Sequence, residues 1–129
     1  MKAAAGAVLV VAGIACAPAS SPDPALGERL YRQCYACHAL EPGANTPAGP
    51  TLHAIVGRPI AAEPGFNYSP ALRRLAAERG RWTPELLDLF LADPAAVAPG
   101  TEMGFAGIAD AEDRRVIIDW LGSRTQPLP

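Results

Sequence analysis

The chain has 129 residues, of which 50% are hydrophobic and 19% are charged, with a net charge of −2. This length predicts a single domain. The slightly acidic balance and the scattered arginines exclude nucleic-acid binding, because that function requires a concentrated basic face.

The first part of the chain, residues 1–19, has the organisation of a secretory signal peptide. A short basic start precedes an apolar run over residues 3–15, and small residues then provide a cleavage site after Ala17 or Ala19. The run is too short to span a bilayer, which takes roughly 20 apolar residues. We therefore expect a periplasmic protein with a mature domain at residues 20–129. The alternative is an uncleaved membrane anchor.

Cys16 lies in this leader and raises a second alternative. The sequence "GIAC" partly resembles a bacterial lipoprotein signal, in which the cysteine is acylated, but Gly13 stands where a large aliphatic residue is usual. We expect Cys16 to be removed with the leader rather than to carry a lipid anchor. Cleavage also removes Lys2, the only lysine, and leaves ten arginines against thirteen acidic residues.

Four segments carry helix start signals followed by apolar residues at helical spacing. They begin at Asp23, Ser69, Thr83 and Asp110. The first runs into the sequence "CYACH", the second should stop at Gly80, and Pro94 should end the third. Residues 41–51 and 95–107 are rich in proline, glycine or both and are expected to be irregular.

No segment shows the alternation of a β-strand, so the predicted fold class is all-α, with several short helices and long loops. A domain of this size with so much irregular backbone and only eight aromatic residues would build a thin core. Long loops without structure of their own are uncommon in compact domains. We therefore expect the loops to wrap around a large apolar prosthetic group.

The sequence "CYACH" contains Cys34, Cys37 and His38 and has the attachment pattern of a c-type haem. Two thiols about one helical turn apart can bond to the two vinyl groups on one edge of the porphyrin, and the adjacent imidazole then ligates the iron. A thioredoxin-like redox pair lacks its preceding strand, and a zinc site lacks a second pair of ligands. A disulfide would leave the histidine unexplained.

The sixth iron ligand has two candidates in the mature chain, Met103 and His53. Met103 is the only methionine after the leader and lies in an irregular segment that is far along the chain from His38. Such a loop can cover the opposite face of a flat cofactor. His53 follows His38 closely across a proline-rich loop, so its imidazole would reach that face less easily. Met103 is therefore the favoured ligand.

The mature chain resembles the class I cytochromes c, in particular the mitochondrial and purple-bacterial type. The resemblance runs from about Gly27 to Leu121 and rests on motifs in family order: "GERLYRQCYACH", "GPTLHAIVGRP", "PGFNYS", Trp82 and "PGTEMGFAGI". It implies a small class I cytochrome c fold around one haem. In that fold Gly27 and Trp120 would belong to the crossing of the first and last helices.

The resemblance also implies roles for individual residues. Cys34 and Cys37 would bind haem c covalently, His38 and Met103 would be its axial ligands, and the carbonyl of Pro50 would accept a hydrogen bond from the proximal imidazole. The residues that would hold or shield the haem propionates are Arg58, Tyr68, Ser69, Trp82 and Thr101.

Three positions depart from the family pattern. Phe90 replaces a tyrosine and Leu72 an asparagine on the methionine side, which should make this side drier and alter the reduction potential. Glu102 stands where a lysine of the family's basic ring would be, so the resemblance does not identify the partner.

The function implied is that of a monomeric periplasmic one-electron carrier, not an enzyme, without a small-molecule substrate. Its partners would be redox proteins: a quinol-oxidising complex, a terminal oxidase, a reaction centre or a dehydrogenase. The alternatives are a dedicated haem subunit of one dehydrogenase or oxidase complex and, less favoured, a haem peroxidase or gas sensor.

Overall fold

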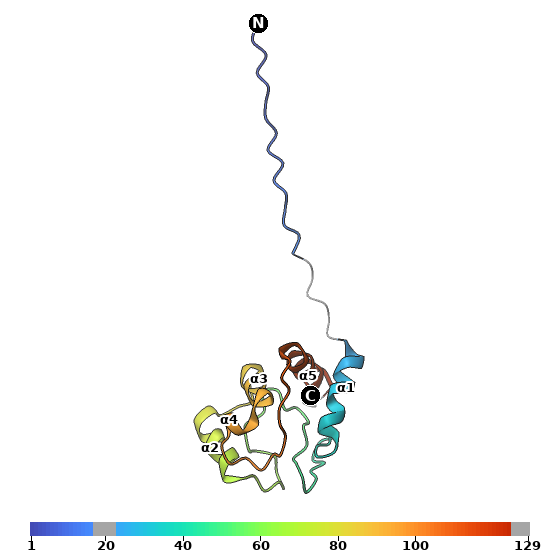
Figure 1. Cartoon of the computed structure of the whole chain (residues 1–129), viewed down its shortest axis with the longest axis vertical. Helices are drawn as coiled ribbons and strands as arrows, with labels where there is room; N and C mark the ends of the chain where they lie inside the picture. Colours follow the sequence, from blue (N-terminus) through green and yellow to red (C-terminus); the bar gives the residue numbers. More distant parts are fainter. Residues whose placement is uncertain (17–22, 125–129) are drawn as a thin grey trace.

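The computed structural model describes residues 1–16 and 23–124 and contains five helices (Figure 1). They are α1 (Pro24–Tyr35), α2 (Pro70–Arg79), α3 (Pro84–Ala92), α4 (Pro94–Val97) and α5 (Ala111–Arg124). The described residues form no sheet and have only two isolated bridges, Thr46 with Gly49 and Pro59 with Arg81. The predicted all-α class is confirmed.

Residues 1–16 form an exposed extended segment that leads away from the helical domain (Figure 1). Both predicted cleavage positions, Ala17 and Ala19, lie outside the described residues. Within the described residues, no helix has the length and hydrophobicity needed to cross a membrane.

Four of the helices begin with the same local signal. The side-chain oxygens of Asp23, Ser69, Thr83 and Asp93 each accept a hydrogen bond from a backbone N–H in the first turn. In every case a proline follows the capping residue, where its missing N–H costs nothing and its fixed φ suits the helix. Such caps stabilise a helix by about 1 kcal/mol each, which explains why these short segments are helical.

Helix α4 corrects the expectation that residues 95–107 are irregular throughout. Asp93 has extended backbone angles, φ −157° and ψ 91°, and so ends α3. Its carboxylate then caps the next turn through the N–H of Ala96 at 3.1 Å. Pro94 therefore starts a helix in addition to following one.

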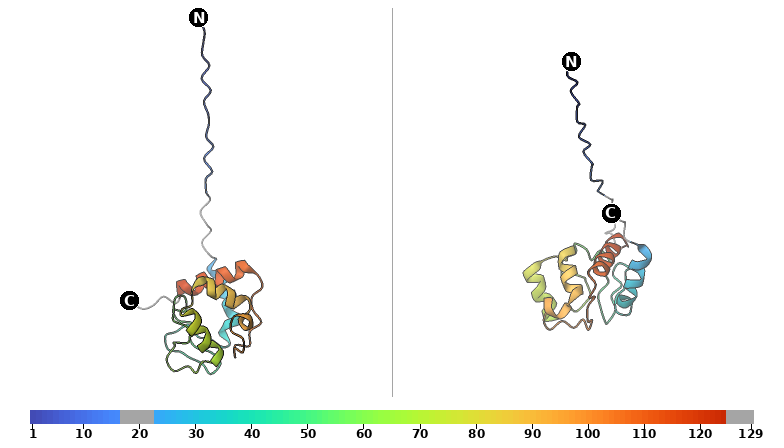
Figure 2. Two further views of the ribbon diagram at one scale, coloured as in Figure 1. Left: turned by 90° about the vertical axis from the view of Figure 1, so that its left-hand side faces the viewer. Right: turned by 45° about the horizontal axis from the view of Figure 1, so that its top comes forward.

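Helices α1 and α5 cross at Gly27 and Trp120, the residues expected to make this contact. A Cβ atom on Gly27 would lie only 2.6 Å from the Cβ of Trp120, so the Trp120 side chain packs directly against the backbone of α1 at this glycine. One turn further along α1, the ring of Tyr31 stacks on Trp120 with 5.2 Å between centroids. This crossing forms one end of the core, and α2 lies at the other end of the molecule (Figure 2).

Two long loops lie between these ends, and Arg114 of α5 anchors the one that contains Met103. The Arg114 Nε donates to Asp88 of α3 at 2.7 Å, and its Nη1 donates to the carbonyls of Ile108 and Ala109 at 2.9 Å. The end of the Met103 loop is thereby fixed to two helices. That position brings the loop opposite the C-terminal end of α1.

Candidate haem-binding site

A cavity of about 940 Å³ lies between the C-terminal end of α1, the start of α2 and the Met103 loop. Ligand sites in proteins have volumes of about 300–1,000 Å³, so this cavity accommodates a large cofactor. Seven of the ten predicted haem-binding residues line it: Cys34, Cys37, His38, Pro50, Ser69, Thr101 and Met103.

His38 is held in one orientation by the backbone. Its Nδ1 lies 2.7 Å from the carbonyl oxygen of Pro50. A carbonyl oxygen only accepts, so Nδ1 carries the proton and Nε2 keeps its lone pair. Burial lowers the pKa of His38; the hydrogen bond to Pro50 opposes this shift and the charge of Arg58 adds to it. The imidazole is therefore neutral at pH 7, as a metal ligand must be.

Two residues to which the sequence assigned no individual role, Gly49 and Thr46, support this arrangement. A Cβ atom on Gly49 would lie 2.6 Å from Cε1 of His38, so only glycine lets the loop pass this close to the ring. The hydroxyl of Thr46 donates to the carbonyl of Cys37 at 2.7 Å. In the sequence, the indication that the loop approaches the His38 ring closely is Gly49, which lies between Pro47 and Pro50 in "PAGP".

The two cysteines lie at the end of α1 as free thiols. The N–H groups of Cys37 and His38 both donate to the carbonyl of Cys34 at 3.0 Å, which closes the last turn and places all three side chains at the cavity wall. Burial, with a smaller contribution from Cys37, raises the pKa of the Cys34 thiol to about 11. That thiol is protonated at neutral pH.

Met103 lies in the wall formed by its loop. Its N–H donates to the hydroxyl of Thr101 at 3.2 Å, and its carbonyl accepts from the N–H of Phe105 at 2.9 Å. The side chain is half-buried and packs against the core. His53, the other candidate ligand, does not line the cavity, and its carbonyl accepts from Arg58.

Arg58, Tyr68 and Trp82 do not line this cavity. Trp82 is buried and contacts the ring of Phe90 edge-on, with 4.9 Å between centroids. The hydroxyl of Tyr68 accepts from the N–H of Glu63 at 3.2 Å. Phe90 also lies outside the wall, whereas Leu72 belongs to it.

The guanidinium of Arg58 has both hydrogen-bonded donors and a buried donor without a partner among the described residues. Its Nη1 donates to the carbonyls of Thr51 and His53, both at 2.9 Å, and lies 3.4 Å from the carboxylate of Glu63. Its Nε is buried and has no partner among the described residues. A buried donor of this kind requires an acceptor, which a haem propionate would supply.

The donor set therefore fits a covalently attached haem. Two thiols, a neutral imidazole and a thioether line one cavity, and within residues 23–124 a buried guanidinium N–H of Arg58 has no partner. The described residues contain no group of three or more His, Cys, Asp and Glu side chains that would hold a metal ion directly.

No protein-family model matches the chain. The cytochrome c2 of Rhodomicrobium vannielii is 37% identical over 119 residues, which cover 92% of this chain and 90% of the relative. The cytochrome c2 of Blastochloris viridis is 38% identical over 113 residues, covering 88% and 87%.

Two solved structures have the same fold as this chain. The structure of cytochrome c2 from Rhodospirillum centenum has a TM-score of 0.72 at 32% identity and covers 80% of this chain and 98% of its own. Cytochrome cH from Methylobacterium extorquens has a TM-score of 0.70 at 36% identity, covering 78% and 98%. Together with the two relatives, these structures confirm the resemblance read from the sequence. The chain therefore belongs to the class I c-type cytochromes of the cytochrome c2 kind, which carry electrons through a covalently bound haem c.

Proposed function

We propose that the chain is a periplasmic one-electron carrier whose haem c is attached at Cys34 and Cys37 and ligated by His38 and Met103. The observation that carries this proposal is the presence of a neutral imidazole and a thioether at the wall of one cavity. Bound haem supplies one-electron chemistry by cycling between ferrous and ferric iron, and methionine–histidine ligation raises its potential.

The residues around the cavity would bind and orient the haem and would exclude water from it. The Pro50 carbonyl fixes the plane of the His38 ring. Thr101 fixes the backbone of Met103 through its hydroxyl. Leu72 lines the cavity where a polar side chain would admit water, which makes the methionine side apolar.

We assign the haem propionates to the side of the cavity near Arg58. The Nε of Arg58 supports this assignment, because a propionate would satisfy a buried donor that has no hydrogen-bond partner among the described residues. Ser69 and Thr101 bring hydroxyls to the cavity wall. Tyr68 and Trp82 complete the set: the Tyr68 hydroxyl keeps its own proton to donate, and Trp82 is buried.

If His38 and Met103 both ligate the iron, no coordination position would remain open, so this carrier would need no substrate and would not act as an enzyme. Its partners would be redox proteins such as a quinol-oxidising complex, a terminal oxidase, a reaction centre or a dehydrogenase, met by a monomer in short-lived encounters. A dedicated subunit of one complex is the second candidate, and Glu102 at the cavity favours it over a general lysine-steered carrier.

Attachment and export are tested together in bacteria that mature c-type cytochromes. The periplasmic fraction should contain a protein that begins just after Ala17 or Ala19 and exceeds its polypeptide mass by one haem. Cys34→Ala and Cys37→Ala should each lose one thioether bond, and the double variant should lose the covalent haem. A double variant that retains covalent haem would contradict the proposed attachment.

A further inference from the structure

The arginines of the domain are unevenly distributed. Residues 73–81, in α2 and just after it, contain Arg73, Arg74, Arg79 and Arg81, all exposed, and one acidic residue, Glu78. None of these four arginines contacts a carboxylate among the described residues, where the ion pairs involve Arg58, Arg114 and Arg115. We call these four arginines the α2 basic face.

The region around α5 carries no such excess of positive charge. Residues 110–124 contain four acidic residues and three arginines. Figure 1 and the right-hand view of Figure 2 place α5 beside α1, away from the end of the molecule that α2 forms. Positive charge is therefore concentrated in residues 73–81, although the net charge of the chain is small, and such a charge distribution orients a molecule as it approaches a charged partner.

The mouth of the haem cavity offers no positive charge. Its lining includes no lysine and no arginine, and Glu102 is its only acidic residue. An acidic partner would find no cation to pair with at the mouth itself. Exposed arginines lie beyond the mouth, in the α2 basic face and at Arg29 and Arg32 of α1.

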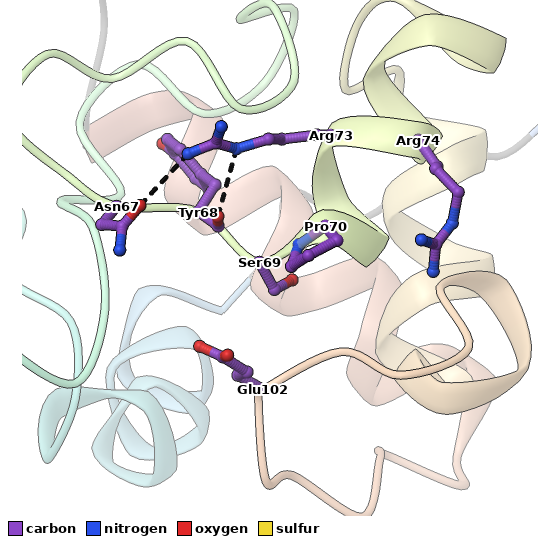
Figure 3. A pocket seen from close by; sticks show the side chains of 7 residues that line it. All are labelled: Asn67, Tyr68, Ser69, Pro70, Arg73, Arg74 and Glu102. Atoms are coloured by element: carbon purple, nitrogen blue, oxygen red, sulfur yellow. Dashed lines mark hydrogen bonds between the residues drawn. The ribbon is translucent and has the colours of Figure 1, made fainter.

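A smaller cleft of about 520 Å³ joins this face to the haem cavity (Figure 3). Arg73 and Arg74 line it, and it shares three residues, Asn67, Ser69 and Glu102, with the larger cavity. The basic face therefore continues into the rim of the haem cavity. A partner held on it lies next to the site of electron exchange.

The guanidinium groups at the cleft are partly held in place. Arg73 donates from Nε to the Tyr68 carbonyl at 3.2 Å and from Nη2 to Asn67 Oδ1 at 3.1 Å. Its Nη1 has no partner among the described residues. Arg74 makes one long contact, 3.4 Å, to the carbonyl of Pro99. Both groups retain donors for a carboxylate, and holding Arg73 in advance lowers the entropy lost on binding.

We propose that the α2 basic face and the adjoining cleft form the docking surface for an acidic redox protein, with Arg73 and Arg74 pairing with its carboxylates. The proposal rests on the proposed function as an electron carrier and specifies the partner's charge and place of contact. Glu102 lines the cleft as well as the haem cavity, so its like charge repels partner carboxylates from its own side and leaves them to Arg73 and Arg74.

The test uses isotope-labelled, reduced holoprotein and a synthetic decaglutamate peptide as the acidic probe. At low ionic strength, amide shifts on titration should concentrate around residues 73–81 and Asn67, and they should diminish as salt is added. Replacing both Arg73 and Arg74 by Gln should weaken peptide binding by about fivefold, as expected for the loss of two exposed ion pairs. The matched control is Arg29→Gln with Arg32→Gln on α1, which removes the same charge from the other end of the molecule.

Three results would overturn the proposal. They are the absence of peptide binding at low salt, shifts centred on α1 or on Gln33 and Ala48 at the cavity mouth, and equal weakening by the control pair. Vesicles containing phosphatidylglycerol, compared with phosphatidylcholine vesicles, provide the membrane arm. Tighter binding to the anionic vesicles than to the peptide through the same arginines would replace the protein partner with a membrane surface.

A failure of the electron-carrier proposal would give results different from a failure of the docking proposal. The Arg73 and Arg74 variant should retain the native spectrum, reduction potential and rate of reduction by a neutral hydroquinone, because neither arginine lines the haem cavity. Loss of these properties in the unmodified protein would overturn the electron-carrier proposal instead.

Discussion

The guanidinium of Arg58 lies 3.4 Å from the carboxylate of Glu63, and both side chains are largely buried, at 12% and 14% exposed. Arg58 also donates to two carbonyls of the loop after Pro50, and its buried Nε has no partner among the described residues. Glu63 is thus a second carboxylate on the arginine that we assign to a haem propionate. It contributes to the charge near the haem and to the attachment of the loop.

Glu63→Gln should lower the free energy of unfolding by about 1 kcal/mol. The loss is smaller than that for a fully broken buried ion pair, because the amide oxygen still accepts from Arg58 and two carbonyls remain. The reduction potential of the Glu63→Gln variant should rise, since removing a negative charge favours the reduced, less positive iron. Denaturant unfolding and redox titration measure both effects. Glu78→Gln, on an exposed carboxylate, should change stability by less than about 0.5 kcal/mol. Equal effects in the two variants would contradict a special role for Glu63.

The helix crossing predicts a clear difference between two glycines. Gly27→Ala places a methyl group against the side chain of Trp120 and should destabilise the holoprotein by about 2–3 kcal/mol, the usual cost of overpacking. Gly122→Ala, in α5, meets only Val56 at an ordinary 3.6 Å and should be neutral or stabilising by up to about 1 kcal/mol. Thermal unfolding of both variants provides the comparison. A Gly27 variant as stable as the Gly122 variant would disprove the close crossing.

Tyr31 predicts an alkaline loss of stability. Its hydroxyl donates to the carbonyl of His38 at 2.7 Å, and burial raises its pKa above the ordinary value of 10.0. The folded state therefore holds this proton more tightly than the unfolded state does. The resulting stability is complete below pH 10 and is lost as the pH rises through the folded-state pKa.

Tyr31→Phe should cost about 1 kcal/mol at neutral pH through the lost hydrogen bond. Above pH 10 the difference in unfolding free energy between the variant and the unmodified protein should become smaller. The variant lacks one of the groups whose ionisation lowers stability at alkaline pH. Tyr68, whose pKa burial also raises, is present in both proteins and so cancels in the comparison. Unfolding at several pH values measures this, and a constant difference up to pH 11 would show that Tyr31 does not contribute.

The sequence predicts correctly the helices whose first turn depends only on neighbouring residues. A capping residue followed by proline marks α1, α2 and α3, and each begins there. The same signal at Asp93 and Pro94 was read only as the end of a helix, because a helix of four residues has almost no apolar periodicity. Its existence depends on the Asp93 cap and on packing against α3.

The functional site likewise has residues that the sequence predicts and contacts that depend on the fold. The spacing within "CYACH" is a chemical requirement, so it identified Cys34 and His38 without knowledge of the fold. The supporting contacts from Thr46 and Gly49 reach the haem motif only because the following loop turns back on it. The pairing of Arg58 with Glu63 likewise depends on how a loop closes, and no periodic pattern in the sequence encodes it.

The most direct test of the account is the near-infrared absorption of the oxidised holoprotein and of two single variants, Met103→Ala and His53→Ala. Iron bonded to a methionine sulfur gives a weak band in this region. The account predicts that the unmodified protein and the His53 variant show the band and that the Met103 variant lacks it. Absence of the band from the unmodified protein, or its persistence without Met103, would contradict His38 and Met103 as the axial pair.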